Sequence, residues 1–87
     1  MSEEIFNLVT FNSTHHAIKA EKELISKGLK IRIIPAPTEV TASCGLSIRV
    51  DEGDFEKVKE ILSSKNVISA GYYLVKKNGY KKEIVRL

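Results

Sequence analysis

The sequence predicts a single α+β domain, residues 1–87, with a ferredoxin-like, split βαβ pattern and one further strand. Three observations lead to this prediction. The chain of 87 residues suffices for one domain with a thin core. Strand-like apolar runs alternate with two stretches of helical period. An Asn-Gly pair near the end of the chain is typical of a β-hairpin.

The first strand and the first helix are expected within the first 28 residues. A run rich in β-branched and aromatic residues favours a strand over 5–11. Asn12 or Ser13 is a candidate helix N-cap, and Gly28 is a candidate stop signal. Between them, apolar residues recur with a period of 3.6 and predict one buried helix face: Ala17, Ile18, Ala20, Leu24 and Ile25.

Two short strands follow, over 30–34 and 46–50. Pro35-Ala-Pro37 ends the first of them and begins a structured loop, in which one helical turn after Pro37 is expected. In a split βαβ unit, the third strand lies between the first two and runs the other way. Residues 12–16 should therefore lie near residues 35–45, at the same end of the sheet.

The second half is expected to contain one helix and two strands. Asp51 or Asp54 is a candidate N-cap for a helix whose apolar positions recur at helical spacing: Phe55, Val58, Ile61 and Leu62. Strands are expected over 67–77 and 80–87, joined by Asn78-Gly79, in which both residues would have positive φ. Both helices should cover one face of a mostly antiparallel sheet, with the hairpin tip far from residues 35–45.

The charge of the chain is modestly positive, with 14 Lys and Arg against 11 Asp and Glu, for a net charge of +3. Much of the excess is local and is interpreted as protection of an edge strand from aggregation, so nucleic acid is not the expected partner. Ile84, Val85 and Leu87 leave a homodimer through this C-terminal strand open. The basic residues are Lys76, Lys77, Lys81, Lys82 and Arg86.

The single cysteine, Cys44, excludes an intramolecular disulfide framework. The Met-Ser-Glu-Glu start lacks a basic segment followed by an apolar one, and no apolar run approaches the roughly 20 residues of a membrane span. We therefore expect a cytoplasmic protein without a membrane partner, in which the thiol stays reduced.

Cys44 is the first candidate for chemistry. Small and polar residues precede it and Gly45 follows, so little side-chain bulk blocks approach to the sulfur. The expected neighbourhood includes the N-terminus of the first helix, which favours an anion and therefore a thiolate. The alternative is a buried cysteine that only fills space.

Three side chains of the first helix are further candidates. His15 points away from the apolar face and is interpreted as a surface residue, whereas His16 lies at the margin of that face. A histidine near Cys44 could act as a base or as a cationic partner. Glu21 falls within the apolar face, so either a structural salt bridge or an acid–base role is expected. The two histidines and one thiol lack a zinc-ligand spacing, and no metal is expected.

Several of these segments together resemble the selenium/sulfur (Se/S) carrier protein-like family of short bacterial domains. The resemblance covers residues 6–73 and rests on residues 11–17, Ala20-Glu21 with Leu24 and Gly28, Pro35-Ala-Pro37, and Ser43-Cys-Gly-Leu46. One departure is Thr38, where the family usually has arginine. The chain also lacks the Cys-Pro-x-Pro motif of better-known sulfur-transfer domains.

The resemblance implies a role in sulfur transfer or selenium metabolism. Cys44 would hold sulfur or selenium as a persulfide or selenenylsulfide, and no other cofactor is implied. Ser43 and Gly45 would shape its loop, while Ser13, Thr14 and His16 would line the facing helix terminus and Glu21 would be the helix acid. We expect a thiol relay between donor and acceptor proteins rather than a turnover enzyme. The alternative is a non-catalytic regulatory module that binds a small ligand or a protein, with a structural Cys44.

Overall fold

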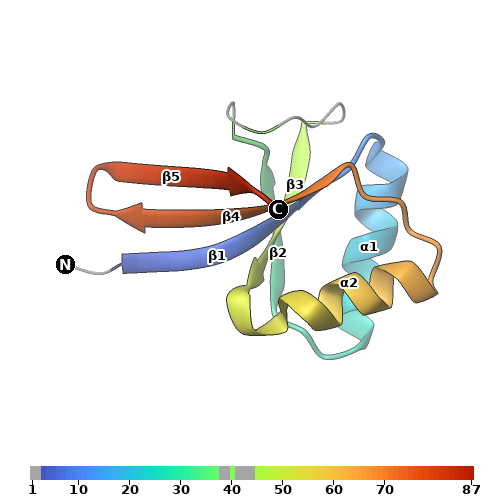
Figure 1. Cartoon of the computed structure of the whole chain (residues 1–87). Coiled ribbons are helices and arrows are strands. Elements are labelled where there is room, and N and C mark those ends of the chain that lie inside the picture. The colour runs from blue at the N-terminus through green and yellow to red at the C-terminus, as the bar shows by residue number, and fades with distance from the viewer. Residues whose placement is uncertain (1–2, 38–39, 41–44) are drawn as a thin grey trace.

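The structure, a computed structural model, describes residues 3–37, 40 and 45–87. These residues form a five-stranded antiparallel sheet with two α-helices on one face (Figure 1). The predicted α+β class and the order of elements along the chain are confirmed. The elements are β1 (Glu3–Thr10), α1 (Thr14–Ser26), β2 (Ile31–Pro35), β3 (Leu46–Asp51), the 3-10 turn η1 (Glu52–Asp54), α2 (Phe55–Ser64), β4 (Gly71–Asn78) and β5 (Lys81–Arg86).

The strands lie in the order β2-β3-β1-β4-β5. β3 pairs antiparallel with both β1 and β2, so β3 lies between the first two strands, as expected from the sequence. β4 pairs along the other side of β1, and β5 pairs with β4 at the outer edge. This arrangement leaves β2 and β5 as the two edge strands of the sheet.

One face of the sheet packs against both helices and forms the larger core cluster. The inner side of α1 is narrower than predicted, because Ile18 and Ile25 are 43% and 55% exposed. The small side chains of Ala17 and Ala20 bring α1 close to the sheet, so neighbouring positions remain outside the contact. The fully or nearly fully buried members of this cluster are Val9, Phe11, Ala17, Ala20, Leu24, Ile48, Val50, Val58, Leu62 and Val67.

The opposite face, which we call the helix-free face, carries a second buried cluster. Leu8 is fully buried there, although no helix covers it. Val40, from the connection between β2 and β3, packs into this cluster and is only 8% exposed. The other buried members are Phe6, Tyr73 and Val75. The β2–β3 connection therefore contributes to the core of a face that lacks helices.

The β4–β5 hairpin differs from the prediction by one residue. Asn78 pairs with Lys81, so Gly79 and Tyr80, not Asn78 and Gly79, form the two-residue loop. Gly79 has a φ of +63°, whereas Asn78 and Tyr80 do not have positive φ. A positive φ at the first loop residue alone is typical of a type II′ turn. Asn78 remains in β4 because it also pairs with Glu3 of β1. The hairpin tip lies far from α1, as expected (Figure 1).

Helix α2 begins after η1, and its N-cap residue is Asp54. Asp54 therefore occupies the N-cap position, as predicted, but neither Asp51 nor Asp54 makes a side-chain capping hydrogen bond. The 3-10 turn precedes the helix, and the Phe55 N–H donates to the Glu52 carbonyl. Residues 67–70 connect α2 to β4 rather than belonging to the strand. In the described ranges, neither helix has the length and apolar content needed to cross a membrane.

Candidate functional site

Four of the predicted site residues that the structure describes, Ser13, Thr14, His16 and Gly45, belong to segments at one end of the sheet, which we call the loop end. There, Thr10 pairs with Ser47 and with Gly71, and Pro35 pairs with Leu46. The backbone N–H of Ala70 also donates to the Thr10 carbonyl at 2.7 Å. The end of β1, which leads into α1, and the described ends of the β2–β3 connection therefore lie at the same end of the sheet, in agreement with the split βαβ pattern (Figure 1).

Helix α1 begins at the loop end with Ser13 as its N-cap. Ser13 has extended backbone angles, and its Oγ accepts the N–H of His16 at 3.2 Å. Thr14, the first helical residue, is exposed. The first turn of α1 contains no acidic side chain. Since the N-terminus of a helix carries a partial positive charge, this end of α1 can attract an anion.

The two histidines of α1 have different surroundings. His15 is exposed, as predicted, whereas His16 is half-buried. Their rings lie edge to face, with centroids 5.7 Å apart. The Nδ1 atom of His16 is buried and has no hydrogen-bond partner in the described part of the chain. A buried nitrogen without a partner is costly, and a hydrogen-bonding group brought to the loop end could satisfy it.

The β2–β3 connection is fixed at the points that the structure describes. The Ala36 N–H donates to the Gly45 carbonyl at 2.9 Å, which closes the base of the loop. Val40 N–H donates to the Pro37 carbonyl at 3.1 Å, and the Val40 side chain packs on the helix-free face. Gly45 has a φ of +75°, a conformation that side chains disfavour, and a Cβ there would meet no atom within 4 Å. Gly45 is therefore suited to this position by its backbone freedom.

Cys44 and Ser43, together with Thr38, lie outside the described residues. In the sequence, Cys44 lies between two described residues of the connection, Val40 and Gly45. The sequence predictions for Cys44 and Ser43 therefore stay predictions. Of the two described residues, Val40 packs on the helix-free face, and Gly45 precedes β3 at the loop end.

Glu21 lies on α1, more than one helical turn beyond His16, and is half-buried. The prediction placed it inside the apolar face, but the buried side of α1 consists of Ala17, Ala20 and Leu24. Within the described ranges, the Glu21 carboxylate has no hydrogen bond or ion pair. The expected structural salt bridge is thus not found, because partial exposure allows the carboxylate to remain hydrated.

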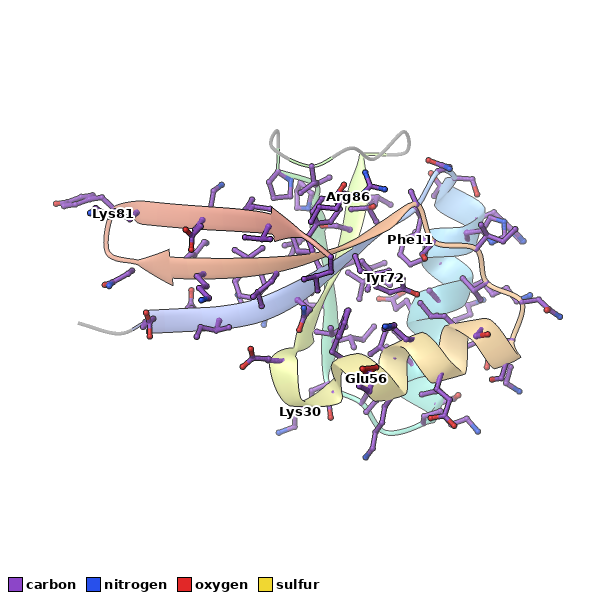
Figure 2. All side chains as sticks on the ribbon, in the orientation of Figure 1. Phe11, Lys30, Glu56, Tyr72, Lys81 and Arg86 are labelled. Carbon is purple, nitrogen blue, oxygen red and sulfur yellow. The ribbon has the colours of Figure 1, made fainter. Side chains whose placement is uncertain are left out.

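Arginines on the helix-free face are the polar residues that sequence reasoning missed. The Cζ atom of Arg49 lies 4.0 Å from the centroid of the Phe6 ring, and its Nη2 lies 3.3 Å from Glu4 Oε1. Arg86 Cζ lies 5.8 Å from the centroid of the Tyr73 ring (Figure 2 labels Arg86). The available signal was a charged residue, Arg49, that interrupts the apolar run of a central strand.

Metal-binding and membrane features do not contribute to the site as far as it is described. Over residues 3–37, 40 and 45–87, no three His, Cys, Asp or Glu side chains gather as potential metal ligands. The site is therefore built from a helix N-terminus, an imidazole and a loop with a fixed base. The positive end of a helix in such a setting can attract an anion.

Comparison with known proteins gives one family. The family model described as "putative Se/S carrier protein-like" matches residues 6–74, which is most of the 87-residue chain. No curated protein and no solved structure gives a significant match. The matched range includes α1, the β2–β3 connection and the residues on both sides of Cys44. The chain therefore belongs to the Se/S carrier protein-like family.

Proposed function

We propose that this chain is a carrier of sulfur or selenium that uses Cys44 as a persulfide or selenenylsulfide site. The observation that carries the proposal is the position of the α1 N-terminus. It lies at the same end of the sheet as Gly45, the residue that follows Cys44, and the first turn of α1 contains no acidic side chain to oppose its positive charge. Family membership supports the same function. We also propose that the fold is ferredoxin-like, with β5 as an addition, because β3 lies between β1 and β2.

The proposed transfer is a thiolate exchange between proteins. The Cys44 thiolate attacks the outer sulfur of a donor persulfide, and the bond between the two donor sulfurs breaks. The inner sulfur of the donor leaves as a thiolate with the electron pair of that bond, so no external oxidant or reductant is consumed. An acceptor thiolate then attacks the outer sulfur on Cys44 in the same way and regenerates the Cys44 thiolate. Selenium in the outer position follows the same scheme.

The described residues support this exchange by electrostatics and hydrogen bonding. The positive end of α1 favours the thiolate, which is the nucleophilic form of cysteine. His16 Nδ1 is buried and has no partner among the described residues, and we propose that a group carried on Cys44 bonds to it. Ser13 acts indirectly, since its hydroxyl fixes the first turn of α1. Thr14 is exposed beside it and is available to an incoming protein.

Sulfur loading tests the proposal directly. The protein, freed of reductant, is incubated with a cysteine desulfurase and cysteine, and its intact mass is measured. Because the chain has one cysteine, we expect a mass gain of one sulfur atom that Cys44→Ser abolishes and dithiothreitol reverses. A protein that accepts persulfide sulfur serves as the positive control. No gain on the wild-type chain, while the positive control is loaded, contradicts the proposal and favours the binding module with a structural Cys44.

A further inference from the structure

A second polar site lies on the helix-free face, at the opposite end of the sheet from the β2–β3 connection. There, the start of β2 and the end of β3 flank a cavity of about 340 Å³. Lys30, labelled in Figure 2, lies at this end just before β2. A water occupies about 30 Å³, so the cavity can hold a small ion with several waters. Its lining residues are Glu4, Lys30, Ile31, Arg32, Arg49 and Asp51.

The two arginines of this cavity are directly opposite each other in the sheet. Arg32 of β2 and Arg49 of β3 are paired residues, and paired residues project from the same face. Like charges directly opposite each other on neighbouring strands destabilise a sheet. Nothing in the packing of the fold requires this pair, because Arg32 is exposed. Lys77 and Lys82 are also opposite each other on this face, but they lie outside the cavity. The two arginines instead line it together with Lys30, an arrangement that suits an anion bound between their side chains.

The guanidinium of Arg49 is held in position by two contacts. It stacks over the Phe6 ring at 4.0 Å, and one of its nitrogens lies 3.3 Å from Glu4 Oε1. A guanidinium has five N–H donors, so the Glu4 contact leaves donors free to bind a ligand. Within residues 3–37, 40 and 45–87, the Arg32 side chain has no ion pair or hydrogen bond, so its guanidinium donors are also free.

We propose that this cavity binds a tetrahedral oxyanion of the phosphate class between Arg32 and Arg49. An arginine guanidinium binds phosphate through two parallel hydrogen bonds. A tetrahedral ion can present oxygens to two guanidinium groups and to the Lys30 ammonium at the same time. A carboxylate can form both of its hydrogen bonds with a single guanidinium and does not need the second arginine. Glu4 and Asp51 lie at the cavity and oppose the anion, so Glu4 competes with phosphate for Arg49.

Nuclear magnetic resonance titration of the full chain with inorganic phosphate tests this proposal, with ionic strength held constant by chloride. We expect saturable shifts of the Arg32 and Arg49 Nε–H signals and of the amides beside them. Arg32→Gln should weaken phosphate binding about tenfold or more, since a charge-assisted hydrogen-bond pair is lost. Arg32→Lys keeps the positive charge but removes the paired guanidinium donors, so it should also weaken phosphate binding.

Two further variants separate a built site from general positive charge. Arg86 lies on the same face, where it pairs with Tyr73, but it is outside the cavity. Arg86→Gln should therefore leave phosphate binding unchanged. Glu4→Gln removes the competing carboxylate and should tighten binding about 2- to 5-fold. Non-saturating shifts that chloride reproduces, an equal loss in Arg86→Gln, or weaker binding in Glu4→Gln would overturn the proposal. Cys44→Ser should not alter phosphate binding, so this site and sulfur loading succeed or fail separately.

Discussion

The two faces of the sheet are buried in different ways. The first face packs against α1 and α2, whose apolar residues repeat at helical spacing. Each helix contains two Lys and two Glu, so its charges balance. The helix-free face is closed by Val40 of the β2–β3 connection and by arginines that lie over Phe6 and Tyr73. One face is thus buried by regular structure, and the other by a loop and by long charged side chains.

This difference separates stability from recognition. Amphipathic helices bury apolar area efficiently but offer a balanced, hydrated outer surface. The helix-free face instead carries more cations than carboxylates, and the connection that contains Cys44 is anchored there through Val40. Its strand positions hold Arg32, Arg49, Lys77, Lys82 and Arg86 against Glu4 and Asp51. We infer that anionic ligands approach the helix-free face, while the helices mainly stabilise the fold, apart from the N-terminus of α1 at the loop end.

The largest effect is expected on the helix-covered face. Phe11→Ala removes the largest fully buried side chain of the core cluster that the sheet forms with both helices (Figure 2 labels Phe11), and should lower the free energy of unfolding by about 3–5 kcal/mol. Urea unfolding followed by circular dichroism measures the change. Ile25→Ala, at a position 55% exposed, is the matched control and should change it by less than about 0.5 kcal/mol. Similar losses in both variants would contradict the assignment of the core.

Truncation of Val40 tests whether the loop stabilises the helix-free face. Val40→Ala should cost about 1–2 kcal/mol, because it exposes part of the cluster around Leu8 and Tyr73. The same urea experiment reports this value. Val85→Ala, on the exposed side of β5, is the control and should be nearly neutral. A neutral Val40→Ala would mean that the connection does not contribute to this core.

Two substitutions of Ser13 separate helix capping from electrostatics. Ser13→Ala should cost about 1 kcal/mol, since the N-cap bond to His16 N–H is lost. Ser13→Asp keeps a capping oxygen and should retain wild-type stability. Its carboxylate places negative charge at the α1 N-terminus, so alkylation of Cys44 by iodoacetamide should become slower. Unchanged alkylation in a stable Ser13→Asp protein would argue against electrostatic activation from this helix end.

The smallest effect is expected for the exposed contacts of Arg49. Arg49→Gln should lower the free energy of unfolding by about 0.5–1 kcal/mol through loss of the Phe6 and Glu4 contacts. Arg32→Gln removes one of two like charges and should be neutral or stabilising by a few tenths of a kcal/mol. Thermal unfolding of both variants at low and high salt measures the difference. A larger loss in Arg32→Gln than in Arg49→Gln would show that the contacts are assigned to the wrong residue.

Local sequence signals predicted the helices and strands. The features that they did not predict depend on which residues pair between strands. Ser13 and Gly28 bound α1 as expected, because capping and left-handed glycine are local properties. The hairpin turn shifted to Gly79-Tyr80 because Asn78 pairs with both Glu3 and Lys81. The burial of Val40 and the Arg32–Arg49 pair likewise depend on which residues meet across the sheet. Such contacts cannot be read from periodicity along the chain.

The proposed activation of Cys44 at the loop end is tested most directly by the alkylation rate of this thiol. The rate with iodoacetamide is measured at pH 7 for the folded chain and for the chain unfolded in urea, with a cysteine-containing peptide correcting for the solvent. We predict faster alkylation in the folded chain, because the positive end of α1 favours the thiolate. Slower alkylation in the folded chain would show a buried, structural cysteine and contradict the proposed carrier function.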